Sequence, residues 1–357
     1  MNAGAKKFRP VRVIIAIILA LLLIVVCYVA YVILSYKRIP DGQQLAPEGS
    51  QSEPVRTGQP VKIVSYNIGF GAYEPDYSFF MDGGTESWAW SKERLEKNIS
   101  SITEFAGTQN ADILLLQEVD ENATRTYHFN EKQHITDGLS NYDSVYARNW
   151  NSAFLFYPLT QPHGKTQTGI LTLSKYDISG AERRSLPVET SLMKLVDLDR
   201  CYSISRIPTD NGKELVLVNV HLSAYTSDGK IAEEQLKILL DELTSEYEKG
   251  NYIVCGGDFN KDLLGDSSKY FGIPGDDYTW AQPIPPEMFD GRPLTLSASS
   301  NAPTSRIADA PYNPEQFVIT LDGFITSDNV KVLSEQTIDT QFAYSDHNPV
   351  EMQFILE

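Results

Sequence analysis

Cysteine is scarce in this chain of 357 residues, which contains three, at positions 27, 201 and 255. Three cysteines cannot form the framework of disulfides that holds small secreted domains together. Cys27 lies inside an apolar run, while Cys201 and Cys255 lie far apart in the sequence. We expect Cys201 and Cys255 to be buried free thiols, with a single bridge between them as the alternative.

Positive charge is scarce beyond the first 38 residues. The chain has 30 Lys and Arg against 47 Asp and Glu, a net charge of −17. Residues 1–38 carry six of the basic residues and no acid, so the remainder has 24 basic and 47 acidic residues, a balance of −23. Proteins that bind duplex nucleic acid without sequence preference need a positive surface. The balance therefore disfavours duplex nucleic acid as a partner, although it leaves room for a local basic patch.

The chain has one long hydrophobic run, residues 13–36, which contains 24 residues without a charge. A membrane-spanning helix needs about 20 apolar residues. The apolar region of a cleaved signal peptide has roughly 7–15 residues and precedes a small-residue cleavage site, which is missing here. The run predicts an uncleaved transmembrane signal anchor, with a buried core helix as the alternative.

The charges beside this run predict its orientation. Four basic residues lie within residues 1–12, whereas Lys37 and Arg38 on the other side are soon followed by acids. The excess of basic residues marks the cytoplasmic side of a membrane helix. We therefore expect residues 1–12 in the cytoplasm and the C-terminal part of the chain outside the cytoplasm, at the cell membrane.

Residues 37–60 contain seven prolines and glycines among polar residues. Such a composition buries little apolar surface and is typical of a flexible linker. We expect one folded domain over residues 61–357, because no second linker and no internal repeat interrupts it. We expect this domain to be monomeric.

Strand-like runs dominate the folded domain. Apolar, β-branched runs predict strands at 61–68, 112–119, 168–176, 200–207, 214–222, 251–257, 317–326, 329–334 and 349–356. Apolar residues at helical spacing predict helices over 91–106 and 229–248. Many strands and few helices in mixed order predict an α/β fold of packed sheets with helices outside, rather than a regular βαβ alternation.

Polar or charged residues end or interrupt several of the apolar runs. They are Asn67, Glu118, His221, Asp258, Asn260, Asp322, Asp346 and His347. Any one of them alone is most simply a strand-end or turn residue. Their repeated occurrence in one domain indicates a shared site.

These side chains are mainly oxygen donors, and no cysteine or histidine cluster accompanies them. Such a set suits the hard cations Mg²⁺ or Mn²⁺ better than zinc. Glu118 and Asp346 match the one or two carboxylates that Mg²⁺ takes from a protein. Two histidines, each with a carboxylate, can handle protons and phosphate charge. A metal and a positioned water suffice for phosphoester hydrolysis.

The segments around these residues carry a specific resemblance. They read SYN, LLLQEVD, VNVHL, GGDFN, LDGFI and SDHNPV. In order and rough spacing, over about residues 61–357, the chain resembles the endonuclease/exonuclease/phosphatase superfamily. That superfamily includes pancreatic-type deoxyribonucleases, neutral sphingomyelinases and inositol polyphosphate 5-phosphatases. The resemblance implies a four-layer α/β sandwich with the site at one edge of its two sheets.

The resemblance also implies a metal site. Glu118 resembles the principal metal ligand of the family, and Asn67 resembles its neighbour at that site. Asp346 resembles a further metal-site carboxylate. The implied cofactor is Mg²⁺ or Mn²⁺.

The remaining motif residues resemble the family's catalytic groups. Asp258 resembles the residue that orients or deprotonates the attacking water, and Asn260 resembles a contact to a phosphate oxygen. His347 resembles the histidine that meets the scissile phosphate, held by Asp322. His221 resembles the second histidine of the deoxyribonuclease and sphingomyelinase branches.

Three further segments bear on the site. Gly323 stands where the family often has an aromatic residue, which affects the packing around the expected histidine–aspartate pair. Residues 69–91 form a long aromatic-rich insertion that either lines a substrate pocket or packs on the core as an ordinary surface loop. Arg125, Tyr127 and His128 are candidate substrate contacts, Arg125 for a second phosphate, with a solvated loop as the alternative.

The sequence favours a phosphodiesterase or phosphatase that acts outside the cytoplasm on a small or lipid-linked phosphoester. An extracytoplasmic nuclease is the second interpretation, and it requires a basic rim. A non-catalytic membrane-anchored binding module is the third, and such a module has no need of the whole set of motif residues.

Overall fold

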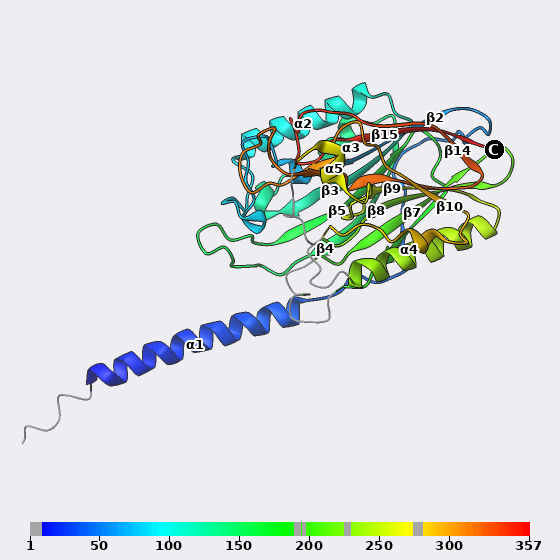
Figure 1. The fold of residues 1–357 in the computed structure, drawn as a ribbon. Coiled ribbons are helices and arrows are strands. Elements are labelled where there is room, and N and C mark those ends of the chain that lie inside the picture. Colours follow the sequence, from blue (N-terminus) through cyan, green and yellow to red (C-terminus); the bar gives the residue numbers. More distant parts are fainter. Residues whose placement is uncertain (1–8, 189–193, 195–197, 225–229, 274–280) are drawn as a thin grey trace, which may run out of the picture.

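The computed structural model describes residues 9–188, 194, 198–224, 230–273 and 281–357. Helix α1 (Arg9–Ser35) projects from a folded domain that contains the other elements (Figure 1). Pro10–Ser35 has 26 residues, and its most apolar stretch has a mean hydropathy of 3.4. The folded domain buries none of that stretch. By length and composition α1 is therefore a candidate membrane span.

One sheet has seven strands in the order β1-β6-β7-β8-β9-β13-β10, in which only β8 and β9 run parallel. Its strands are β1 (Gln43–Leu45), β6 (Gly180–Ser185), β7 (Cys201–Pro208), β8 (Glu214–His221), β9 (Tyr252–Asp258), β13 (Asp322–Ser327) and β10 (Leu294–Ser297).

The other large sheet has six strands in the order β14-β15-β2-β3-β5-β4, in which only β2 and β3 run parallel. Its strands are β14 (Val330–Thr337), β15 (Val350–Leu356), β2 (Val61–Asn67), β3 (Ile113–Ala123), β5 (Thr166–Ser174) and β4 (Asp143–Asn151). The short strands β11 (Ser305–Arg306) and β12 (Val318–Ile319) pair with each other.

The two large sheets pack face to face through alternate apolar side chains, since successive residues of a strand point to opposite faces. This inner layer includes Ile63, Leu115, Leu217, Val254 and Phe324, all without solvent exposure. Helices α2 (Lys92–Thr108) and α3 (Glu131–Gly138) cover the six-stranded sheet, and α4 (Lys230–Glu248) covers the seven-stranded one (Figure 1). Short helices are α5 (Ser267–Phe271), η1 (Gly69–Gly71), η2 (Phe80–Asp82), η3 (Thr124–Thr126) and η5 (Pro286–Phe289). The prediction of a four-layer α/β sandwich is confirmed.

Two expectations about local structure are corrected. The run at 317–326 is not one strand, because Thr320 and Leu321 separate β12 from β13 and the two belong to different sheets. Residues 37–60 are not a free tether, because β1 pairs with β6 and the backbone N–H of Val55 donates to the Pro208 carbonyl at 2.9 Å. The Val55 side chain is fully buried. This burial and pairing offset the entropy cost of ordering a Pro- and Gly-rich segment.

Candidate active site

The topology brings the strand ends that carry the motif residues to one edge of the sandwich. Parallel strands end at the same edge of a sheet, so β2 and β3 place Asn67 beside the segment of Glu118, and β8 and β9 place His221 opposite Asp258. Antiparallel β13 begins at the same edge, where Asp322 pairs with Asp258. A site assembled from strand ends is held by the most rigid part of the fold.

Glu118 is placed by a β-bulge. The pairing of β3 with β5 shifts register between Leu116 and Val119, and Glu118 has a φ of 57°. Residues other than glycine rarely adopt this left-handed conformation, and such bulges re-aim side chains next to active sites. The carboxylate consequently lines the pocket beside Asp346.

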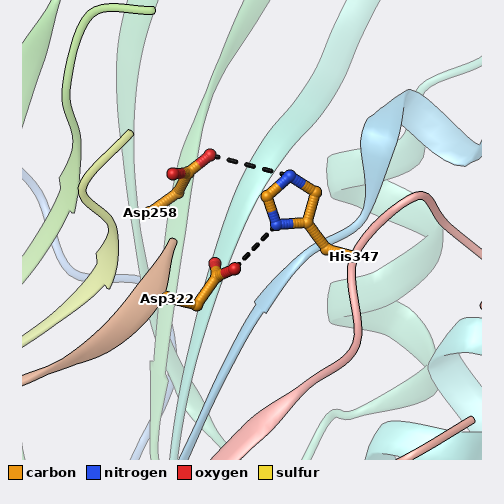
Figure 2. Close-up of side chains that lie close together, drawn as sticks. All are labelled: Asp258, Asp322 and His347. Atoms are coloured by element: carbon orange, nitrogen blue, oxygen red, sulfur yellow. Dashed lines mark hydrogen bonds and ion pairs between the residues drawn. The ribbon is translucent and has the colours of Figure 1, made fainter. Parts of the chain in front are cut away.

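A buried histidine and two buried aspartates form the centre of the site (Figure 2). His347 Nδ1 lies 2.7 Å from Asp322 Oδ2, and His347 Nε2 lies 3.8 Å from Asp258 Oδ2. Asp258, Asp322 and His347 offer ligand atoms within 4.8 Å of one another, as a metal site would. A Cβ at Gly323 would lie 2.7 Å from the carbonyl oxygen of Ser297, so only glycine fits beside this pair. The histidine–aspartate pair forms without the aromatic residue common in the family.

The neighbouring charges shift the pKa values of His347 and Asp258. Burial lowers the pKa of His347, but the charge and hydrogen bond of Asp322, helped by Asp258 and Asp346, outweigh it and raise the pKa to about 10. Burial and the neighbouring Asp322 carboxylate raise the pKa of Asp258 to about 7. At neutral pH the imidazole is thus a cation that faces a carboxylate poised to exchange a proton.

Asn67 connects this centre to Glu118. Its Nδ2 donates to Glu118 Oε1 at 3.2 Å and to Asp258 Oδ2 at 3.1 Å, and its Oδ1 accepts from the Gly69 backbone N–H at 3.0 Å. Burial and the nearby Asp346 carboxylate raise the pKa of Glu118. Glu118 and Asp346 are half-buried carboxylates that repel each other, and a divalent cation would fit between them and relieve that repulsion, with Asn67 presenting its nitrogen rather than its oxygen to Glu118.

A model of the endonuclease/exonuclease/phosphatase family matches residues 64–347. The chain belongs to this family. The resemblance of the sequence motifs is thereby confirmed, and the family's enzymes act on phosphoester bonds.

Solved structures agree with this membership. An endonuclease/exonuclease/phosphatase from Beutenbergia cavernae is 16% identical, with a TM-score of 0.57 over 84% of this chain and 72% of that one. ANGEL2, a 2',3'-cyclic phosphatase, is 17% identical, with a TM-score of 0.56 over 88% and 99%. The human nocturnin catalytic domain is 18% identical, with a TM-score of 0.53 over 88% and 98%. No curated protein sequence matches the chain. At these identities the structural similarity establishes the fold alone.

The two remaining family positions also lie at the pocket. His221 Nε2 is 3.5 Å from Asp258 Oδ2, at the outer limit of a hydrogen bond, and its Nδ1 has no partner among the residues that the structure describes. Burial, and then the charges of Arg200 and His347, lower its pKa, so His221 is neutral at pH 7. Asn260 donates from its backbone N–H to Asp258 Oδ1 at 2.8 Å and from Nδ2 to the Leu222 carbonyl.

Of the three candidate substrate contacts, the structure brings one to the pocket. Arg125 lines it, but Nε and Nη2 of its guanidinium donate to the two carboxylate oxygens of Asp120, and the group stacks 3.6 Å from the centre of the Phe70 ring. Tyr127 and His128 are not among the lining residues. The Tyr127 hydroxyl donates to the Ala89 carbonyl, and the exposed His128 contacts Asn122.

The pocket has a volume of about 650 Å³. The insertion at 69–91 both lines the pocket and packs on the core. Phe80 and Met81 line the pocket, whereas Tyr77 is a fully buried core residue. Sequence reasoning missed several other lining residues, among them Asn149, Trp150, His163 and Arg200. The polar residues at the ends of 143–151 and 200–207 are the signal that could have identified two of these positions.

Proposed function

We propose that this chain is a membrane-anchored hydrolase that uses Mg²⁺ or Mn²⁺ to cleave a small or lipid-linked phosphoester outside the cytoplasm. The observation that carries the proposal is the buried centre of His347 between Asp322 and Asp258, with Glu118 and Asp346 beside it in one pocket. A binding module would gain nothing from burying three ionisable groups at this cost in desolvation.

The proton path follows from the geometry. Asp258, with its pKa near 7, accepts a proton from the water whose oxygen forms the new bond to phosphorus. The bond from phosphorus to the leaving oxygen breaks, and that oxygen takes the proton of His347 Nε2. Asp258 Oδ2 lies 3.8 Å from this nitrogen and returns the proton to it after the products leave. Each group ends in its starting protonation state.

Other residues supply charge and orientation. Asp322 fixes the His347 ring and keeps it protonated. Neutral His221 and the Asn260 amide can contact phosphate oxygens from the other side of Asp258. A divalent ion held by Glu118 and Asp346, with Asn67 as the neighbouring residue that positions Glu118, would polarise the phosphoryl group and neutralise charge in the transition state.

Two similar structures hold mimics of phosphate. The nocturnin domain binds a sulfate anion, and ANGEL2 binds adenosine-2',3'-vanadate. Together with the buried cation at His347, these relatives support an oxyanion as the group bound in this pocket.

The test is a panel of phosphoesters offered to the full chain in detergent micelles, with Mg²⁺, with Mn²⁺ and with EDTA. We expect metal-dependent hydrolysis of at least one monoester or diester, lost on EDTA treatment. Hydrolysis of none of them with either metal would refute the proposal, and preferred cleavage of DNA would replace it with the nuclease interpretation.

A further inference from the structure

The loop of residues 152–163, between β4 and β5, joins the pocket to α1. Its Leu155, Tyr157 and His163 line the pocket. The same loop binds the end of α1: the Tyr28 hydroxyl donates to the Phe154 carbonyl and accepts from the Phe156 N–H, both at 3.1 Å. The Tyr28 and Phe156 rings also pack, with centroids 5.2 Å apart. One wall of the pocket is therefore fixed to the candidate membrane span.

The contacts between α1 and the loop indicate where the loop lies relative to the membrane. Tyr28 lies seven residues before the end of α1 at Ser35, which is about 10 Å along a helix. Val32, one turn further on, is buried against the protein, and the Tyr31 hydroxyl accepts from the Phe154 N–H at 3.2 Å. Tyrosines near the ends of spanning helices mark the membrane–water interface. If α1 spans the membrane, the loop lies at that interface.

The composition of the loop suits this position. Residues 152–163 contain no charged side chain, in a domain with a balance of −23. Its tip exposes Phe156 by 53%, Tyr157 by 70% and Leu159 by 85%. Met81, which follows Phe80 in η2, is exposed by 56%, and the Phe80 ring packs on Tyr157 with centroids 6.0 Å apart. Large exposed apolar side chains gathered beside a pocket mark a surface that binds a partner or a membrane. Because this loop is bonded to α1, the candidate membrane span, we expect the membrane to be that partner.

The interior of the pocket has the opposite character. Asn149, His163 and Arg200 line it, and each is more than nine-tenths buried. Both amide atoms of Asn149, both ring nitrogens of His163, and Nε and Nη1 of Arg200 have no hydrogen-bond partner within the described part of the chain. Unpaired buried polar atoms destabilise a folded protein, and a polar ligand that bonds to them would remove that cost. Arg200 adds a positive charge suited to an anionic group.

We infer that the substrate is a lipid phosphoester from the leaflet in which α1 is anchored. Its head group fills the polar interior beside Asn149, His163 and Arg200, while its chains stay in the leaflet against the rim formed by Phe156, Tyr157 and Leu159. This inference rests on the proposed function for the reaction, and on the α1 contacts for the source of the substrate. A water-soluble ester of the same head group lacks the apolar part that this rim accommodates.

The position of the rim can be tested without any activity. In a Cys27→Ser background the remaining native thiols are buried, so Leu159→Cys accepts an environment-sensitive NBD label. Leu333→Cys is the matched control, because Leu333 is an exposed leucine on β14 (44%). In the full chain reconstituted into phosphatidylcholine–phosphatidylglycerol vesicles, we expect blue-shifted NBD emission quenched by brominated lipid at 159 and water-like emission at 333. Water-like emission at both positions would overturn the inference.

The source of the substrate is tested by matched pairs of esters. Vesicles carrying phosphatidylglycerol, phosphatidylethanolamine, phosphatidic acid or sphingomyelin are compared with the corresponding chain-free head-group esters in solution. We expect Leu159→Asp to lose at least about 10-fold in hydrolysis of a vesicle lipid but to keep its rate on soluble bis(p-nitrophenyl) phosphate, a change worth about 1.4 kcal/mol. Leu333→Asp should change neither rate.

The outcomes separate the two proposals. Hydrolysis of the soluble diester with no preference for any vesicle lipid over its chain-free ester would overturn the lipid inference and leave the hydrolase intact. Hydrolysis of no ester would overturn the hydrolase and with it the lipid substrate, while the NBD emission would still report whether the rim enters the membrane.

Discussion

Replacing Asp322 by asparagine should remove the cation from the centre of the site. The amide keeps the shape of the side chain but cannot stabilise the imidazolium, which Asp322 binds at 2.7 Å. The carboxylate of Asp322 is the largest influence opposing burial in raising the pKa of His347 to about 10. Because each pKa unit corresponds to about 1.4 kcal/mol, the rise represents several kcal/mol in favour of the protonated ring. In Asp322→Asn the pKa should fall toward its ordinary value, leaving the ring neutral at pH 8.

The kinetic consequence follows from the role of that proton. We expect His347→Ala to lose on the order of 10²–10⁴ in kcat, the range for acid–base and charge-stabilising groups. Asp322→Asn should lose less, since the ring remains, and its loss should shrink as the pH is lowered and the ring regains its proton. The double variant should cost little more than His347→Ala, because the two residues act as one unit. Strictly additive losses in log kcat would refute the pairing.

Stability supplies an independent measurement of the same pair. The folded-state pKa of His347 is raised, so its contribution is fully present below about pH 6.5 and is lost as the pH rises through about 10. In that window the folded protein holds one proton more than the unfolded chain. The free energy of unfolding in EDTA should therefore fall by up to about 1.4 kcal/mol per pH unit more steeply for the native protein than for Asp322→Asn. Parallel slopes would contradict the assigned protonation.

Three further expectations concern the metal, the membrane and nucleic acid. Glu118→Gln should lose on the order of 10²–10³ in kcat/KM in Mg²⁺ with an unchanged melting temperature, and full activity would remove Glu118 from the metal site. A C-terminal alkaline phosphatase fusion should be active in cells and a cytoplasmic reporter fusion silent, whereas the reverse pattern would reverse the topology. Plasmid DNA should be cleaved poorly at physiological salt because of the −23 balance, and efficient cleavage at low enzyme concentration would favour the nuclease.

The sequence predicted the elements whose residues are uniformly apolar. Strands β2, β8 and β9 are buried along nearly their whole length, so their composition alone identifies them. Strands β4 and β6 were missed because they contain many polar residues, several of them buried, and β6 reads GAERRS. Arg183 in β6 is fully buried through hydrogen bonds to backbone carbonyls of Arg148, Pro40 and Asp199. Such a buried arginine depends on tertiary contacts that no local pattern encodes.

Some residues of the candidate site could likewise be predicted from the sequence, and others could not. The motif residues lie at strand ends, where a polar residue contrasts with an apolar run, and Cys201 and Cys255 are buried and unbridged as expected. Asn149, His163 and Arg200 were missed as pocket residues because they come from distant parts of the chain, namely strand β4, the loop before β5 and the segment before β7. Arg125 was noticed for its charge, yet its charge is already paired with Asp120. Sequence indicates which residues are unusual, but contacts decide which are available to a ligand.

The acidic balance of the domain and the chemistry of its pocket are compatible, because the two act over different distances. Over more than a Debye length of about 8–10 Å, surface charge is screened, and the balance of −23 mainly opposes large polyanions. Within the pocket, Arg200 and the protonated His347 are buried, so their fields are screened far less. In the proposed pocket a single phosphoester could contact Arg200 and His347 directly, whereas a long duplex would lie across the acidic surface around it. The charge distribution that disfavours nucleic acid is therefore compatible with the small or lipid-linked phosphoester that we propose as the substrate.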